Sequence, residues 1–292
     1  MYKREVYTIQ AYDKMPIRVA RLQPEEGTPK GVVQMIHGFG EGIELYYELA
    51  KCFVDDGFVA VVQDLRGFGK MEHLTVSKRR KARGVVKRYT DLLRDVEAVR
   101  ESVEKIFPSL PMYLYGHSMG GNIAINHLLT QDNAQQKYQK LILEAPWLRL
   151  HKPPSRFTVF CAGVLGGLNH KWAKHTKLNR AHITRNREAL HGIGSSEIFH
   201  DRIALRLFCQ IAKAGEFAIK NADKVTVPTL LMAAGDDKIV STPAILAYAD
   251  KAGDNTRLIV YDHAFHSLHT DNEKAVVQQD MLAFLNEAST SD

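Results

Sequence analysis

Short apolar runs alternate with longer segments of mixed polarity along most of this chain. Apolar runs of this length are typical of buried strands. Eight strands are expected, near residues 3–9, 15–20, 32–36, 58–63, 111–115, 139–144, 229–234 and 257–261. Five helices are expected, near residues 43–56, 90–106, 119–130, 242–252 and 273–287. The first two strands suggest an edge hairpin. The others alternate with helices, which predicts an α/β fold with a mostly parallel eight-stranded sheet covered on both faces.

This alternation stops over residues 147–222, where no strand is evident. We expect a helical cap there, inserted after the sixth strand into a core formed by residues 1–146 and 223–292. Residues 157–168 are almost wholly apolar but too few to span a bilayer. Basic residues flank them, namely Lys152, Arg156, Lys171, Lys174 and Lys177. Together with Trp172 these favour a helix that contacts a lipid surface, and a helix packed on the core is the alternative.

Candidate chemistry begins with the pentapeptide Gly-His-Ser-Met-Gly at residues 116–120. It follows the predicted strand 111–115 and precedes the predicted helix 119–130. A G-x-S-x-G motif between a strand and a helix is typical of a nucleophile elbow, a sharp turn that exposes the serine at the carboxyl edge of a sheet. Ser118 is therefore the predicted nucleophile of a serine hydrolase, and a glycine-rich turn with an incidental serine is the alternative.

A nucleophilic serine needs an acid and a histidine, expected in that order along the chain. Asp236 and Asp237 lie in the loop after the strand 229–234. The loop after the next strand contains three histidines, His263, His266 and His269. Glu144 ends the sixth strand and is an alternative acid for the same histidine. The three histidines could also be considered as metal ligands, but no cysteine or carboxylate cluster near them in the sequence supports that.

Donors for an oxyanion are expected from the residue after the nucleophile and from an early strand-to-helix loop. That loop begins with His37 and Gly38, directly after the strand 32–36. Its glycines allow the backbone to approach a substrate oxygen closely. We assign the amides of Phe39 and Met119 as the donors, and we expect His37 and Gly38 beside the substrate. A plain glycine turn is the alternative.

These motifs make the chain resemble the monoacylglycerol lipase and lysophospholipase group of α/β-hydrolases over nearly its whole length. The matching segments are residues 37–41, 64–69, 116–121 and 227–228, with Asp237 and His266. The resemblance implies an α/β-hydrolase fold and a triad of Ser118, Asp237 and His266. It also implies hydrolysis of an ester with a long acyl chain. Val164 and Leu165, in the apolar stretch of the cap, are then expected to contact that chain.

The expected mechanism is acyl transfer through Ser118, which requires no cofactor or metal. A serine aminopeptidase is one alternative, because an acid in the cap could bind a free amine. The candidate acids are Glu188, Glu197, Asp201 and Glu216. A catalytically silent binding protein with the hydrolase fold is another alternative. A lipid or ester is the expected small-molecule partner.

Charge and cysteine content refine this picture. The 292 residues carry a formal net charge of +6, and seven of the twelve residues 77–88 are Lys or Arg. A solvated loop is the default interpretation of that segment. Attraction to an anionic membrane surface is an alternative. Nucleic-acid binding is not supported, because the segment has no interleaved aromatic residues and matches no known module. Three scattered cysteines suggest no disulfide framework. No signal peptide is apparent, so we expect a cytoplasmic protein.

Overall fold

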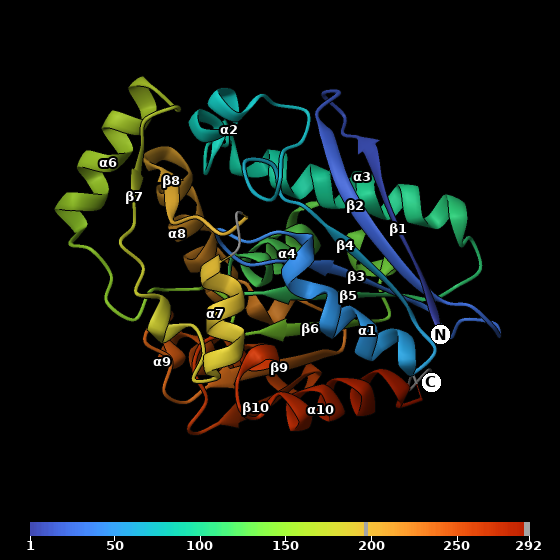
Figure 1. Cartoon of the computed structure of the whole chain (residues 1–292). Coiled ribbons are helices and arrows are strands. Elements are labelled where there is room, and N and C mark those ends of the chain that lie inside the picture. Colours follow the sequence, from blue (N-terminus) through green and yellow to red (C-terminus); the bar gives the residue numbers. More distant parts are fainter. Residues whose placement is uncertain (196–197, 289–292) are drawn as a thin grey trace.

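A computed structural model describes residues 1–195 and 198–288 (Figure 1). Its main sheet has the strand order β1-β2-β4-β3-β5-β6-β9-β10. The strands are β1 (Tyr2–Gln10), β2 (Pro16–Pro24), β3 (Val32–Ile36), β4 (Val59–Gln63), β5 (Met112–His117), β6 (Lys140–Glu144), β9 (Thr229–Ala234) and β10 (Thr256–Tyr261). β2 runs antiparallel to both of its neighbours, and all other pairs are parallel. The predicted α/β-hydrolase sheet, mostly parallel and eight-stranded, is confirmed.

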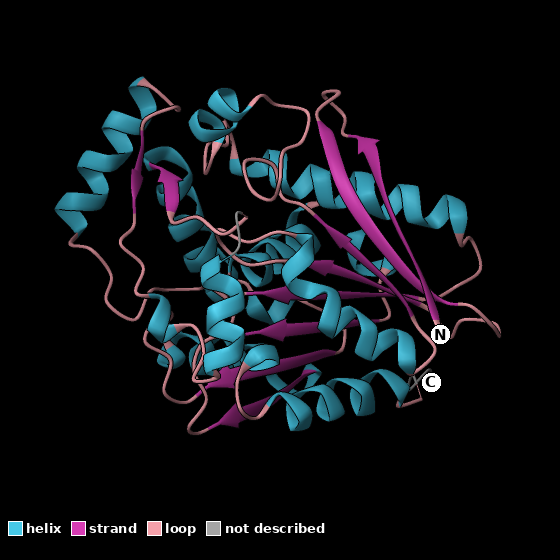
Figure 2. Cartoon of the chain, viewed as in Figure 1, coloured by secondary structure: helices cyan, strands magenta, loops and turns pink. Residues whose placement is uncertain are grey.

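Helices cover both faces of this sheet (Figure 2). One face packs against α3 (Tyr89–Ile106), α4 (Met119–Thr130), α8 (Leu205–Lys220) and α9 (Thr242–Ala252). The other packs against α1 (Tyr47–Asp55) and α10 (Lys274–Asn286). In β3, Val32 and Ile36 face the first layer and Val33 and Met35 the second, because successive side chains of a strand point to opposite faces. Both faces of the central strands are therefore buried, which explains their continuous apolar runs.

Six further helical elements of the described residues have three or four residues each. They are α5 (Ala134–Lys137) and the 3₁₀ turns Ile43–Tyr46, Arg180–His182, Ala222–Lys224, Gly253–Asn255 and Leu268–Thr270. The helix predicted over 43–56 is thus a 3₁₀ turn followed by α1.

The insertion between β6 and β9 contains α6 (Arg156–Leu168), α7 (Arg187–Ser195) and two strands, β7 (Ala173–His175) and β8 (Arg202–Ala204). The expectation of no strand there was wrong: β7 and β8 pair antiparallel, and strands of three residues are too short to leave a pattern. In Figure 1, α6 and β7 lie at the left edge of the molecule, opposite the β1–β2 hairpin. By contrast, α8 buries its apolar side in the main core.

The basic segment also differs from its default interpretation as a loop, because α2 occupies Val76–Ala82. The residues after α2 pack against β8. The Ala204 amide donates to the Gly84 carbonyl at 2.8 Å, and a Cβ atom at Gly84 would lie 1.8 Å from the Arg202 carbonyl oxygen. Among the described residues, no helix has both the length and the apolar character needed to cross a membrane.

Candidate active site

Ser118 lies in the sharp turn between β5 and α4, with φ 52° and ψ −115°. This is a strained backbone conformation for a residue with a side chain. The flanking glycines are required by close packing. A Cβ atom at Gly116 would lie 2.6 Å from the Gly120 carbonyl oxygen, and one at Gly120 would lie 2.1 Å from the Ile36 carbonyl oxygen. The predicted strand–turn–helix context of the pentapeptide is therefore present.

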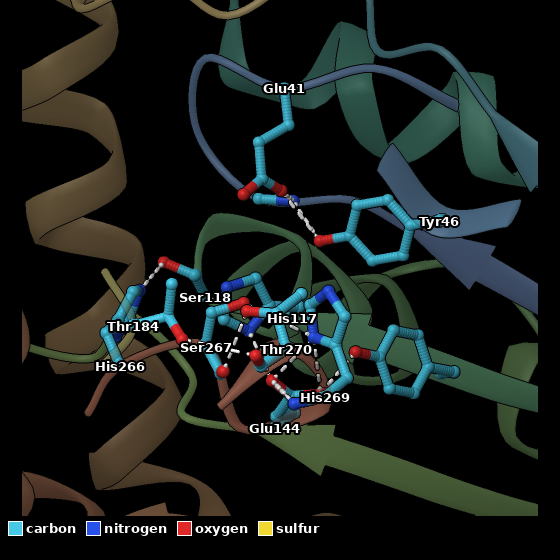
Figure 3. Close-up of polar contacts among 12 residues, drawn as sticks. Glu41, Tyr46, His117, Ser118, Glu144, Thr184, His266, Ser267, His269 and Thr270 are labelled. Atoms are coloured by element: carbon cyan, nitrogen blue, oxygen red, sulfur yellow. Dashed lines mark hydrogen bonds and ion pairs between the residues drawn. The ribbon is translucent and has the colours of Figure 1, made fainter. Parts of the chain in front are cut away.

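Ser118, His266 and Asp237 form a continuous hydrogen-bonded chain. Ser118 Oγ lies 2.8 Å from His266 Nε2, and His266 Nδ1 lies 2.7 Å from Asp237 Oδ2. The three side chains follow β5, β10 and β9, so they meet at the carboxyl edge of the sheet. Figure 3 shows the contact between Ser118 and His266. The structure thus brings together the three residues that the sequence selected.

The Asp237 carboxylate is held by its own loop. Its Oδ1 atom accepts hydrogen bonds from the amides of Ile239 at 2.8 Å and Val240 at 2.9 Å, which leaves Oδ2 for His266. Burial acts to lower the pKa of His266, but the charge of Asp237 and its hydrogen bond outweigh burial, and the pKa is raised. The imidazole can therefore hold a proton taken from a neighbouring hydroxyl.

The two assigned oxyanion donors lie on elements that pack tightly together. The close approach of Gly120 to the end of β3 sets the loop that contains Phe39 beside the start of α4, where Met119 is the first residue. Within the described part of the chain, neither the Phe39 nor the Met119 amide donates to a protein acceptor. Both amides are therefore available to a bound anion.

His37 and Gly38, which were expected beside the substrate, instead make hydrogen bonds that hold the loop containing Phe39. His37 Nε2 accepts from the Leu65 amide at 3.0 Å, and the Gly38 amide donates to the Glu41 carboxylate at 2.8 Å. Neither residue lines the cavity described below. Their position in the sequence could place them near the nucleophile, but it could not show which way they face.

A cavity of about 500 Å³ opens onto Ser118 and His266. Its apolar wall consists mainly of aromatic and branched side chains from the core and the insertion, including Phe39, Trp147, Leu178, Phe199, Ile203 and Phe208. From α6 it receives Thr158, Val159 and Ala162.

Val164 and Leu165 lie outside this cavity, with 51% and 42% of their surfaces exposed. Residues three or four apart share a face of a helix, so Thr158 and Ala162 lie on the inward face, Leu165 continues that face beyond the cavity, and Val164 lies on the opposite side of α6. The apolar stretch of the cap therefore contributes to the cavity wall, but through residues other than Val164 and Leu165.

A second buried carboxylate lies beside the Ser118–His266–Asp237 chain. Glu144, the alternative acid, contacts His269 Nδ1 at 2.8 Å rather than His266 (Figure 3). It also accepts a hydrogen bond from the Tyr115 hydroxyl at 2.5 Å. Burial opposes the charge of Glu144, but His269 and His117 hold its pKa well below the usual range. The sequence places Glu144 and Ser118 at the same sheet edge but does not show which histidine each would contact.

The histidines around Glu144 also form a candidate metal site. Within the described residues, one group of side chains could hold a metal ion: His117, Glu144 and His269, whose ligand atoms all lie within 4.8 Å of one another. The set considered from the sequence, His263, His266 and His269, is not brought together in this way, because His266 turns to Asp237 and His269 to Glu144.

The fold and this site define a serine hydrolase of the α/β-hydrolase class. The chain belongs to the Hydrolase_4 family, described as serine aminopeptidase, S33, which matches residues 27–273. Human monoglyceride lipase is 30% identical to it over 251 residues, covering 84% of this chain and 78% of that protein. Phospholipase YtpA of Bacillus subtilis (strain 168) is 24% identical over 261 residues, covering 89% and 96%.

A solved structure of a soluble variant of monoglyceride lipase from Saccharomyces cerevisiae, in complex with a substrate analog, superposes with a TM-score of 0.85 at 21% identity, covering 98% of this chain and 96% of that one. An uncharacterized abhydrolase domain-containing protein of Dictyostelium discoideum is much longer, and the chain covers 25% of it. The protein is thus a monoglyceride lipase-like α/β-hydrolase and, by class, a carboxylic ester hydrolase.

Proposed function

We propose that this protein hydrolyses a lipid ester with a medium or long acyl chain, a monoacylglycerol or a lysophospholipid, and that Ser118, His266 and Asp237 are its catalytic triad. The observation that carries the proposal is the hydroxyl of Ser118, hydrogen-bonded to His266 and facing a mainly apolar cavity of about 500 Å³. A site of this kind suits a reactive carbonyl attached to a hydrocarbon chain.

In the proposed reaction, Ser118 Oγ attacks the ester carbonyl carbon while its proton passes to His266 Nε2. The amides of Phe39 and Met119 stabilise the oxyanion of the tetrahedral intermediate. Asp237 keeps the Nδ1 proton of His266 in place and stabilises the imidazolium. His266 then protonates the leaving alcohol, and water repeats the sequence on the acyl-enzyme to release a carboxylic acid.

The cavity wall supports a preference for longer acyl chains. Each methylene moved from water to an apolar site contributes about 0.8 kcal/mol. Two added carbons should therefore raise kcat/KM by roughly tenfold until the cavity is full. We expect p-nitrophenyl esters to improve from acetate toward about eight to twelve carbons.

The same wall argues against the aminopeptidase alternative, although the family carries that name. A free amine needs a carboxylate, and the one carboxylate among the described lining residues is Glu41, a buried side chain whose Oε2 accepts from the Gly38 amide and the Tyr46 hydroxyl. Among the acids named from the sequence, Glu188 lies outside the lining, Asp201 contacts His175 and Glu216 contacts Arg149, while Glu197 lies outside the described residues.

Two measurements test the proposal. A fluorophosphonate probe should label Ser118, and Ser118→Ala should abolish both labelling and ester hydrolysis. Failure of labelling would favour the silent binding protein. In a chain-length series, Ala162→Asp should flatten the rise from acetate to decanoate, because it places a charge in the cavity. Val164→Asp, on the outer side of the same helix, is the matched control and should keep the rise. A wild-type preference for acetate would contradict a lipid substrate.

We extend the proposal to a transient membrane contact through the outer side of α6. Phe157, Phe160, Val164 and Leu168 are all more than half exposed there, an unusual density of apolar surface for one helix. Co-sedimentation with anionic vesicles should fall in Val164→Asp while hydrolysis of soluble esters persists. Equal co-sedimentation of both forms would contradict the contact.

A further inference from the structure

The cavity that opens onto Ser118 has positively charged side chains in its lining as well as an apolar wall. Four lysines belong to its lining: Lys152, Lys174, Lys177 and Lys238. They come from separate places in the chain, namely the loop after β6, β7 itself, the loop after β7 and the loop after β9. All four are exposed, which is expected of ammonium groups at the rim of a cavity rather than at its floor.

The positive charge of this rim is largely uncompensated. Lys238 lies 3.4 Å from the Asp236 carboxylate. Over residues 1–195 and 198–288, the ammonium groups of Lys152, Lys174 and Lys177 have no carboxylate within ion-pair distance. The carboxylate of Glu41 is buried and already accepts two hydrogen bonds.

The backbone that carries Lys177 is held in place. Lys177 has a left-handed conformation with φ 57°, which is uncommon for a residue with a side chain. Asp201 stabilises it: its carbonyl accepts from the Thr176 amide at 2.7 Å, and its carboxylate accepts from the Lys177 amide at 3.3 Å and contacts His175 Nδ1 at 2.6 Å. The position of Lys177 at the rim is therefore defined by several contacts rather than by chance exposure.

We propose that the lysine rim, Lys152, Lys174 and Lys177 with Lys238, binds an anionic phosphate headgroup, so that the preferred substrate is a lysophospholipid rather than a neutral monoacylglycerol. This inference rests on the proposed ester hydrolysis and adds the headgroup to it. The acyl chain occupies the apolar wall, its carbonyl lies at Ser118, and the glycerol carries its phosphate to the lysine rim. Water adds across the ester bond to give a carboxylic acid and a glycerophosphate, and the phosphate ester stays intact.

The test uses two substrates that differ only in the phosphate: 1-octanoylglycerol and 1-octanoylglycerol 3-phosphate, both kept below the concentration at which they aggregate. The measured quantity is the ratio of kcat/KM for the phosphate ester to kcat/KM for the neutral ester. An exposed ion pair changes an equilibrium by up to about fivefold. The triple variant K152Q/K174Q/K177Q should therefore lower the ratio by roughly threefold to a hundredfold, and 0.5 M salt should lower it in the wild type.

A matched control removes three charges elsewhere. K78Q/K81Q/K87Q changes exposed lysines in and after α2, none of which lines the cavity, and lowers the net charge by the same amount. It should keep the wild-type ratio. Thermal unfolding of all three proteins confirms that the variants fold. An equal loss in the control would show a general attraction of anions to a basic protein and would overturn the headgroup site.

Further outcomes separate the possibilities. A wild-type ratio near one that the triple variant leaves unchanged overturns the lysine rim as a headgroup site, while ester hydrolysis still supports the proposed function. No hydrolysis of either octanoyl ester would defeat the proposed function itself. Inorganic phosphate and glycerol 3-phosphate are then compared as inhibitors of p-nitrophenyl butyrate hydrolysis. Stronger inhibition by glycerol 3-phosphate supports headgroup binding, and equal inhibition overturns it in favour of a free-phosphate site.

Discussion

Replacing Asp237 by Asn tests the assignment of the acid most directly, because the change keeps the size of the side chain. The loop amides of Ile239 and Val240 both donate to Oδ1 of Asp237, and an asparagine can keep that oxygen in the same place. Its NH₂ group then faces His266 Nδ1, where it can only donate. His266 must place its own proton on Nε2, the nitrogen that lies 2.8 Å from Ser118 Oγ. A protonated Nε2 cannot accept the serine proton.

The expected cost is on the order of 10⁴ in kcat, which corresponds to about 5 kcal/mol of transition-state stabilisation. The pKa of His266 should also fall, because burial lowers it and Asp237 is the first group that opposes burial. The acid limb of the kcat/KM profile of the variant should therefore move to lower pH. The loop contacts persist, so thermal stability should change little.

The assay is p-nitrophenyl octanoate hydrolysis over pH 5–9, with the rate of fluorophosphonate labelling as a second measure of Ser118 reactivity. Two controls bracket the change. Asp236→Asn alters the neighbouring exposed acid, whose partner is Lys238, and Glu144→Gln alters the buried carboxylate that contacts His269. A loss of less than tenfold in Asp237→Asn, or an equal loss in a stably folded Glu144→Gln, would refute the assignment.

Two further predictions concern the same site. In the wild type, kcat/KM should rise with pH as His266 loses its proton and then level off, with a midpoint above the ordinary value of about 6.5 because Asp237 outweighs burial; a flat profile from pH 5 to 8 would contradict a histidine base. Gly120→Ala should lower Tm by roughly 5–10 °C, because its Cβ would lie 2.1 Å from the Ile36 carbonyl oxygen. Gly167→Ala, with nothing within 4 Å, is the control, and equal Tm values would contradict the tight packing.

Much of the fold could be predicted because its signals are local. The central strands of the main sheet are short apolar runs, and their parallel arrangement follows from their alternation with helices. Signals were absent where elements are small or depend on their surroundings. The strands β7 and β8 have three residues each, which is too short for an apolar pattern. The helix α2 is charged and has no buried residue, so it also lacks an apolar pattern.

In the candidate site, too, local features could be predicted from the sequence and features that depend on packing could not. The elbow could be predicted because a sharp turn excludes side chains beside Ser118, a steric rule that acts between neighbours in the chain. The side of α6 that faces the cavity could not be predicted, because almost every residue of this helix is apolar and no polar stripe distinguishes Val159 from Val164. Which side is buried depends on what packs against the helix.

By itself, the sequence determined the strands of the sheet and their alternation with helices, the place of Ser118 and the order of its partners, because apolar runs and turn sterics are local properties of the chain. Tertiary structure alone decided that Glu144 contacts His269 while Asp237 contacts His266, since Glu144 ends β6 and Asp237 follows β9 at the same sheet edge. It also decided that lysines from four separate segments meet at one cavity. Such choices depend on distances between segments far apart in the chain, which only the packed fold sets.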